Sequence, residues 1–141
     1  MLQTEEKRRL AEAALAGLGR SYAPYSHFHV SAALLGEDGR IYTGVNIENA
    51  AYGPSVCAER CAIFKAVSEG CLSFRGIAIC GGTDGRVEGY CPPCGVCRQV
   101  MREFCAPDFP VLLVRSESDW REYSLNQLLP ESFGPEQLTM D

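Results

Sequence analysis

Apolar residues recur along the first part of the chain at spacings typical of short helices and strands. Residues 5–19 carry apolar side chains three and four positions apart and end in glycine, so they predict an amphipathic helix. Residues 28–36 and 40–48 are two partly alternating apolar runs, and Glu37-Asp38-Gly39 between them has turn chemistry. These two runs predict a β-hairpin.

The rest of the chain alternates between the same two kinds of pattern. In order, it predicts helix 57–70, strand 74–82, helix 97–104, strand 111–115 and a short helix in the segment SLNQLLP. Helices that alternate with strands after a hairpin predict an α/β sandwich around a mixed sheet. With 141 residues, 46% of them hydrophobic, the chain has the size of one domain, which we expect to span residues 1–141.

The charge and the termini narrow the range of partners. A net charge of −5 without a clustered Lys/Arg stripe argues against a polynucleotide ligand, so a nucleic-acid-like substrate is expected to be a monomer without phosphates. The longest apolar runs are too short to cross a bilayer. The N-terminal segment MLQTEEKRRL is charged where a signal peptide needs an apolar region, so we expect a cytoplasmic protein with reduced thiols.

The segment CPPCGVC places Cys91, Cys94 and Cys97 at intervals of three residues, which raises the question of a metal. An iron–sulfur cluster of the bacterial ferredoxin type needs a fourth cysteine soon after the third, followed by proline, and Cys105 is too distant and precedes Ala106. A zinc site needs only Cys94 and Cys97, which share one helical face, and a third ligand from elsewhere.

Cys57 is the strongest candidate for that third ligand because Glu59 follows it by two residues. Zinc-dependent deaminases of nucleobases combine a His-x-Glu or Cys-x-Glu segment with a Pro-Cys-x-x-Cys segment, and their glutamate is not a ligand. The chain carries both halves, each opening a predicted helix. We therefore expect Zn²⁺ on Cys57, Cys94 and Cys97. Cys91 is more simply a bystander, and the other four cysteines are interpreted as ordinary small buried residues: Cys61, Cys71, Cys80 and Cys105.

With these residues in hand, the sequence strongly resembles the small homotetrameric cytidine deaminases. The resemblance extends from about residue 22 to residue 137, and its motifs occur in the family's order: YAPYS, AALL, NIENAAY, CAERCAI, AVSEG, PCGVCRQVMREF and LLPESFGPE. It implies a three-layer α/β/α sandwich with a roughly five-stranded mixed sheet. It also implies a cytoplasmic homotetramer that deaminates cytidine and 2′-deoxycytidine in pyrimidine salvage, with one Zn²⁺ per chain.

The resemblance also implies a role for each matching residue. Glu59 is implied as the catalytic acid and base, which moves a proton from water to ring atom N3 and then to the leaving amino group, and Arg60 as the charge that offsets three thiolates. Four residues are implied to bind the nucleoside: Phe28, Asn46, Glu48 and Ala58. Tyr52 and Phe133 are implied to reach the site of a neighbouring subunit.

The chain departs from the usual family pattern at a few positions. Pro92 replaces the usual serine before Pro-Cys, in a segment whose carbonyl faces the leaving group, and a carbonyl survives that change. His29 and Ser31 stand where other residues are commoner, which could alter the edge of the pocket. Neither His27 nor His29 is expected to be a ligand, and both are expected at the surface.

Two alternatives stay open at this point. One is a deaminase of the same chemistry acting on another aminopyrimidine nucleoside, such as a blasticidin-type antibiotic, although NIENAAY favours an ordinary ribose or deoxyribose. The other is a non-enzymatic protein with structural zinc or an iron–sulfur cluster. The GGTDG loop at residues 81–85 lacks a following Lys-Ser/Thr, so it is interpreted as a turn rather than a phosphate-binding loop.

Overall fold

The computed structural model describes residues 1–138 of the chain. Its helices are α1 (Thr4–Gly17), η1 (Leu18–Arg20), α2 (Ala58–Ser68), α3 (Gly95–Phe104), α4 (Leu125–Leu128) and η2 (Pro135–Gln137), where η marks a 3₁₀ turn. Its strands are β1 (Phe28–Gly36), β2 (Ile41–Val45), β3 (Phe74–Thr83), β4 (Pro110–Ser116) and β5 (Asp119–Ser124).

The five strands form one mixed sheet in the order β2-β1-β3-β4-β5. Strands β3 and β4 are parallel, and the other neighbouring pairs are antiparallel. The parallel pair is connected through α3, as a crossover between parallel strands requires. The beginning of β1 at Phe28 therefore lies beside the ends of β2 at Val45 and of β3 at Thr83.

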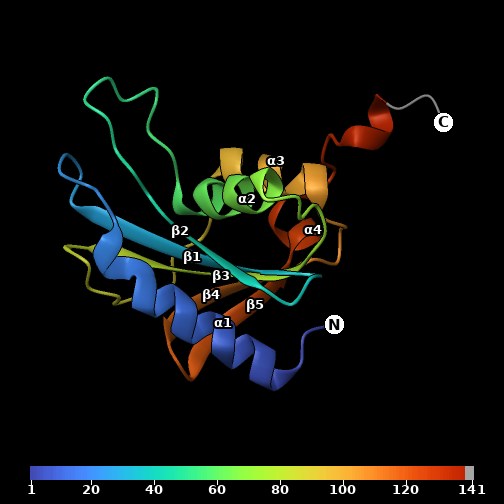
Figure 1. The fold of residues 1–141 in the computed structure, drawn as a ribbon, viewed down its shortest axis with the longest axis horizontal. Helices are drawn as coiled ribbons and strands as arrows, with labels where there is room; N and C mark the ends of the chain where they lie inside the picture. Colours follow the sequence, from blue (N-terminus) through green and yellow to red (C-terminus); the bar gives the residue numbers. More distant parts are fainter. Residues whose placement is uncertain (139–141) are drawn as a thin grey trace.

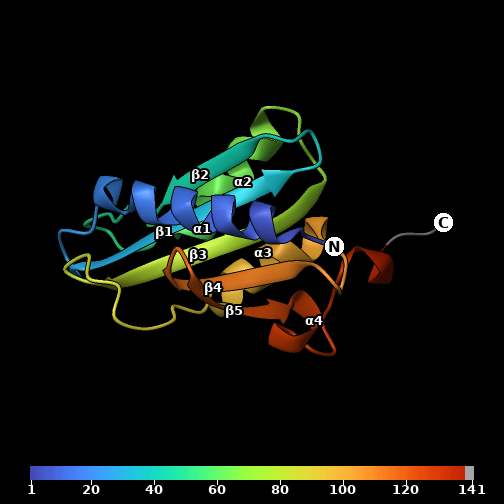
Figure 2. The same ribbon diagram turned by 90° about the horizontal axis from the view of Figure 1, so that it is seen from below.

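Helices cover both faces of the sheet, which makes three layers. Figure 1 shows the sheet with α1 on one side and α2 and α3 on the other, and Figure 2 shows α1 crossing the sheet in front of these two helices. Side chains alternate along each strand, so Ala33, Leu35 and Leu112 pack against α1, while Leu34 and Ile79 pack against α2 and α3. The predicted α/β/α sandwich with a mixed five-stranded sheet is confirmed.

Most predicted elements occur within a few residues of their expected bounds. Strand β1 begins and ends where it was predicted, β2 is shorter than the predicted run, and α3 begins two residues earlier than predicted. Strand β5 had no counterpart among the predicted segments. The single-domain organisation over residues 1–141 stays a prediction, and residues 139–141 lie outside the described part of the chain.

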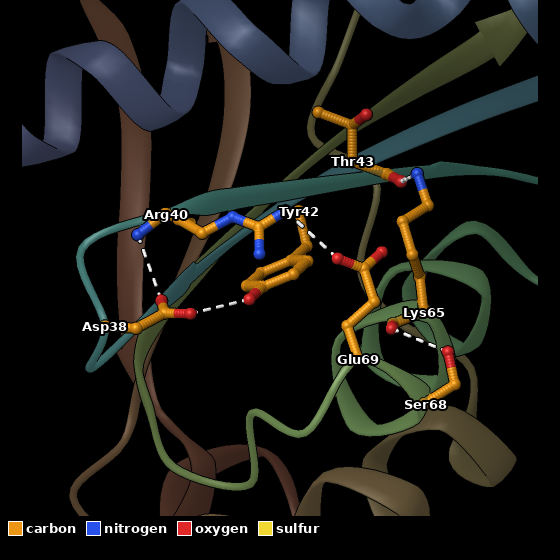
Figure 3. A network of polar contacts seen from close by, with 7 residues as sticks. All are labelled: Asp38, Arg40, Tyr42, Thr43, Lys65, Ser68 and Glu69. Atoms are coloured by element: carbon orange, nitrogen blue, oxygen red, sulfur yellow. Dashed lines mark hydrogen bonds and ion pairs between the residues drawn. The ribbon is translucent and has the colours of Figure 1, made fainter.

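The turn between β1 and β2 is tied to the C-terminal end of α2 by polar contacts. Asp38 Oδ2 accepts a hydrogen bond from the Tyr42 hydroxyl at 2.6 Å, and Oδ1 accepts one from the backbone N–H of Arg40 at 3.0 Å. The Arg40 guanidinium forms an ion pair with Glu69 at 3.0 Å. Figure 3 shows the network, which comprises Asp38, Arg40, Tyr42, Thr43, Lys65, Ser68 and Glu69. It fixes one end of α2 against the hairpin.

A glycine in β2 allows the other half of α2 to lie directly on the sheet. A Cβ atom at Gly44 would come within 2.4 Å of the Ala62 nitrogen and 2.5 Å of the Ala58 oxygen, both of them backbone atoms. Only glycine permits so close an approach. The first turn of α2, which carries Glu59, is consequently held at a fixed height above β2.

Two further observations concern the chain as a whole. Over residues 1–138, the helices lack the combined length and apolar character that a bilayer crossing demands. All eight cysteines are free thiols.

Candidate active site

Three thiols converge where the N-terminal ends of α2 and α3 meet. Cys94 Sγ lies 3.6 Å from Cys57 Sγ and 3.5 Å from Cys97 Sγ, and all three sulfur atoms lie within 4.8 Å of one another. Cys57 is separated from the other two by more than 35 positions in the sequence, so the fold creates this cluster. Cys91 does not belong to it, and among residues 1–138 no other group of this kind is found.

Two of the three thiols occupy the N-cap positions of helices. Cys57 precedes α2 with extended backbone angles of −79° and 158°, and Cys94 precedes α3 with angles of −67° and 165°. The N-terminus of a helix carries partial positive charge, which stabilises a thiolate. The N-cap position also explains how Cys57 and Glu59 share one site, because Cys57 lies off the end of the helix rather than on its opposite face.

Arg60 supplies a full positive charge to the same sulfurs. Its Nη2 atom lies 3.4 Å from Cys57 Sγ. Hydrogen bonding from Cys97, together with contacts from Arg60 and Cys94, lowers the pKa of Cys57 to about 5. The same hydrogen bond between Cys57 and Cys97 raises the pKa of Cys97. The thiolate form is thus favoured at Cys57 more than at Cys97.

Glu59 is a buried carboxyl group beside this cluster. Only 3% of the residue is exposed, and burial raises its pKa to about 7, with the Cys57 thiolate adding to the effect and a backbone hydrogen bond and Arg60 opposing it. A carboxyl group with such a pKa can both accept and return a proton near neutral pH. Glu59 lies in the first turn of α2, and both Cys57 and Cys97 are near enough to affect its pKa.

The geometry and chemistry of the thiols fit zinc. In a tetrahedral site with Zn–S bonds of about 2.3 Å, neighbouring sulfurs lie roughly 3.8 Å apart, close to the two separations in the structure. Three protein ligands leave a fourth position open for water or substrate, which is the pattern of catalytic rather than structural zinc. A four-thiolate cluster does not fit, because Cys91 lies outside the group.

Comparison with known proteins assigns the family. The family profile described as the cytidine and deoxycytidylate deaminase zinc-binding region matches residues 4–113, which include all three thiols and Glu59. The chain belongs to this deaminase family. A relative named cytidine deaminase from Sporosarcina psychrophila is 50% identical over 120 residues, covering 85% of each chain. A probable cytidine deaminase from Dictyostelium discoideum is 42% identical over 137 residues, covering 97% of this chain and 90% of its own.

Solved structures of the same family have the same fold. A cytidine deaminase from Burkholderia pseudomallei superposes with a TM-score of 0.80 at 44% identity, over 89% of this chain and 97% of its own. A cytidine deaminase from Mycobacterium tuberculosis gives a TM-score of 0.75 at 36% identity, over 89% and 95% of the two chains. The similarity therefore covers the deaminase fold nearly from end to end.

Asn46, which the resemblance implies as a nucleoside-binding residue, directly follows β2, and its side chain pairs with the backbone of β1. Its Oδ1 accepts from the backbone N–H of Val30 at 2.9 Å, and its Nδ2 donates to the carbonyl of Phe28 at 2.8 Å. Oδ1 also contacts the hydroxyl of Ser21. The amide thus takes the place of a peptide group beside β1, with one Nδ2 hydrogen unused by these contacts.

Glu48 organises the loop that precedes β1. Its Oε1 accepts from the backbone N–H groups of Tyr25 and Ser26 at 3.0 and 3.1 Å, and its Oε2 accepts from the Ser26 hydroxyl. The bond from the Ser26 hydroxyl is the main reason that the pKa of Glu48 is lowered, so its carboxylate is charged. A hollow of about 400 Å³ opens here, lined by Tyr25, Ser26, Glu48, Tyr52 and Ser55.

The aromatic residues implied for the site are exposed. Phe28 is 40% exposed at the start of β1, and Tyr52 is 72% exposed, with an edge-to-face contact to Tyr25 at 6.1 Å between ring centroids. Tyr52 also has a φ of 62°, which is uncommon for an aromatic residue. Phe133 is 57% exposed near η2, away from these loops in sequence, and its backbone carbonyl accepts a hydrogen bond from Gln99.

Some contacts around Asn46 and Glu48 had no signal in the sequence pattern. Ser26 binds the carboxylate of Glu48, and Ser21 lies between Asn46 and His29, whose Nδ1 is 2.9 Å from the Ser21 hydroxyl. His27 is exposed as expected, whereas His29 is half-buried. Ser21 and Asn46, and likewise Ser26 and Glu48, are more than 20 positions apart in the sequence. The spacing of residues within one segment therefore could not predict these contacts.

Proposed function

We propose that the chain is a zinc-dependent enzyme that hydrolyses cytidine and 2′-deoxycytidine to uridine and 2′-deoxyuridine with release of ammonia. The observation that carries the proposal is a buried carboxyl group with a pKa near 7 beside three converging thiols. The relatives that cover most of the chain are named cytidine deaminases, which supports the same activity. We place the reaction in cytoplasmic pyrimidine salvage, consistent with eight free thiols and a net charge of −5.

The chemistry requires a water molecule to add at C4 of the base and the amino group to leave. Cys57, Cys94 and Cys97 would hold Zn²⁺, which would supply a Lewis acid that lowers the pKa of water. The Glu59 carboxylate accepts a proton from the attacking water and delivers it to ring atom N3, which makes C4 more electrophilic. Glu59 then takes a second proton from the hydroxyl group added at C4 and delivers it to the amino nitrogen, so that the C–N bond breaks, ammonia departs and a carbonyl remains at C4.

Arg60 keeps this centre electrically balanced. Three thiolates around a divalent cation leave a net charge of −1, which disfavours a further anion beside them. The Arg60 guanidinium at 3.4 Å from Cys57 Sγ and the N-termini of α2 and α3 offset that charge. The carbonyl of Pro92 is proposed to face the leaving amino group.

We assign the nucleoside to the loops at the ends of β1 and β2. Asn46 has one Nδ2 hydrogen left for a sugar hydroxyl, and the Glu48 carboxylate can accept from another. Phe28 offers an exposed ring for the flat base. Ala58, the first residue of α2, is fully buried, and its backbone lies at the entrance to the helix between Cys57 and Glu59.

We further propose a homotetramer in which neighbouring subunits complete each site. Tyr52 and Phe133 are large aromatic side chains that are 72% and 57% exposed in the isolated chain. The C-terminal segment that bears Phe133 is held on α3, because Arg102 bonds the Ser132 hydroxyl at 2.8 Å and forms an ion pair with Glu136. An exposed aromatic side chain on a segment whose neighbouring residues are bound to α3 is suited to enter a pocket of another subunit.

The direct test is to incubate the purified protein with cytidine and to measure uridine and ammonia. We expect equal amounts of both products, and loss of activity in the Glu59→Gln variant. Glu103→Gln, an exposed carboxyl substitution on α3, serves as the matched control and should remain active. Failure of the zinc-loaded wild-type protein to convert cytidine, or conversion of a bulky nucleoside antibiotic in preference to it, would contradict the proposal.

A further inference from the structure

We propose that Ser21 and His29 are positioning residues that fix the amide of Asn46 for recognition of the sugar. This inference rests on the proposed function, because it explains how the Asn46 amide, one of the proposed sugar-binding groups, is oriented. It concerns residues on the α1 side of the sheet, outside the cluster formed by the thiols and Glu59.

The three side chains form a continuous hydrogen-bonded chain. His29 Nδ1 lies 2.9 Å from Ser21 Oγ, and Ser21 Oγ contacts Asn46 Oδ1. The backbone holds these groups in place. The N–H of Tyr22 donates to the carbonyl of Asn46 at 3.0 Å, and the N–H of Glu48 donates to the carbonyl of Tyr22 at 2.9 Å. The segment with Ser21 therefore runs beside the end of β2.

The donors and acceptors can be assigned from chemistry alone. Asn46 Oδ1 faces the N–H of Val30 and Nδ2 faces the carbonyl of Phe28, which identifies the oxygen and the nitrogen of the amide. Because Oδ1 only accepts, Ser21 must donate its hydroxyl hydrogen to it. Ser21 Oγ has then given its only hydrogen, so it acts as the acceptor toward His29. The His29 Nδ1–H group is therefore the donor in this contact.

The consequence is an Asn46 amide with one defined free donor. Oδ1 receives two hydrogen bonds and Nδ2 gives one, so its second N–H is aimed in a fixed direction. Each of these bonds opposes rotation of the amide, whose torsion is otherwise broad. Ser21 and His29 supply one of the bonds to Oδ1, so their loss should weaken binding of a sugar hydroxyl without changing the acid–base chemistry at Glu59.

His29 reaches Ser21 from the opposite layer to the active site. Side chains alternate along β1, so His29 shares a face with Ala33 and Leu35, which pack against α1. His29 also lines a hollow of about 390 Å³ with Leu15, Leu18, Gly19, Asp84 and Gly85. The contact thus couples the packing of α1 to the orientation of Asn46.

The test compares variants of Ser21 and His29 on two nucleosides. Ser21→Ala removes the hydroxyl, His29→Leu removes the Nδ1 donor, and His29→Asn keeps an N–H donor near the position of Nδ1. We expect KM for cytidine to rise roughly 3- to 10-fold in Ser21→Ala and His29→Leu, the range for one lost neutral hydrogen bond, with kcat within about 2-fold. His29→Asn should restore KM toward the wild-type value.

The second nucleoside is 2′,3′-dideoxycytidine, used as a competitive inhibitor, because its sugar lacks the 2′- and 3′-hydroxyls, the ones assigned to Asn46, and keeps only the 5′-hydroxyl. Its inhibition constant should be the same in the wild type and in these variants. Ser31→Ala is the matched control on the α1 side of β1, because the Ser31 hydroxyl is buried and has no hydrogen-bond partner among residues 1–138. It should leave KM unchanged.

Several results would overturn the inference. An equal loss for cytidine and the dideoxy analogue would show that Ser21 supports the fold rather than the sugar, and an unchanged KM for cytidine would show no role. An effect in Ser21→Ala without one in His29→Leu would remove His29 from the chain. A wild-type protein inactive on cytidine would instead refute the proposed function, so the two failures are distinguishable.

Discussion

At the scale of single residues, the site depends on one buried carboxyl group next to three thiols. Cys57, Glu59, Cys94 and Cys97 could be predicted from the sequence because their spacing reflects two helix N-termini, where a ligand at the cap and a residue in the first turn share one end of the helix. The partners of Asn46 could not be predicted in this way. Ser21 is 25 positions from Asn46, and nothing in its local pattern shows that it pairs with the end of β2.

The first prediction concerns Glu59 and the proton transfers assigned to it. Glu59→Gln keeps the size and shape of the side chain but cannot carry protons, so we expect bound zinc and folding to be retained while turnover falls at least about 10²- to 10⁴-fold. Metal content by mass spectrometry and steady-state deamination of cytidine measure the two effects. Near-normal activity in the zinc-loaded variant would remove Glu59 from the mechanism.

The second prediction concerns Arg60 and the charge of the metal centre. Arg60→Ala removes the guanidinium that lies 3.4 Å from Cys57 Sγ, so three thiolates lose their nearest full positive charge. We expect weaker zinc retention in competition with a chelator and slower turnover. Arg86→Ala, at an exposed position, is the control. Unchanged zinc retention and turnover in Arg60→Ala would show that the helix termini alone balance the site.

At the scale of elements, the position of α2 on the sheet determines where Glu59 lies. Periodicity predicted α2, β1 and β3 because each buries a continuous apolar face. It did not predict β5, whose residues DWREYS contain few apolar side chains and form an edge strand with one neighbour. Such a strand is stabilised by backbone pairing with β4, which leaves little trace in composition.

The third prediction tests the close contact between α2 and β2. Gly44→Ala places a Cβ atom within 2.5 Å of backbone atoms of Ala58 and Ala62, which cannot move without displacing the helix. We expect a loss of about 1–3 kcal/mol in the free energy of unfolding and reduced turnover, because Glu59 moves with α2. Gly89→Ala is the matched control, since nothing lies within 4 Å of a Cβ there. Equal stability of the two variants would show that the contact is not tight.

At the scale of the whole molecule, the single chain exposes two large aromatic residues, Tyr52 and Phe133. Tyr52 and Phe133 lie on segments far apart in sequence, and both are more than half exposed. The sequence alone could not show which surfaces meet, because interfaces between copies are set by the shape of the folded chain. The proposed homotetramer with shared sites would account for the exposure of both residues.

The fourth prediction tests shared sites by complementation. Co-expressed Glu59→Gln and Phe133→Ala chains should regain part of the activity, because some hybrid sites combine an intact Glu59 with a neighbour's intact Phe133. Glu59→Gln with Cys57→Ala is the control and should stay inactive if the tetramer is as proposed, since both residues belong to the same subunit's α2 region. Sedimentation should show four chains, and a fully active monomer would refute the arrangement.

The account as a whole depends on one zinc ion per chain, held by three thiols and required for deamination. The most direct measurement is to remove metal from the purified protein with a chelator, add zinc back in known amounts, and record ammonia release from cytidine at each step. We expect activity to rise in proportion to bound zinc and to reach its plateau at one ion per chain, with no recovery in Cys57→Ala and full recovery in Cys91→Ala. Full activity in the zinc-free protein, or recovery in Cys57→Ala but not in Cys91→Ala, would contradict the central claim.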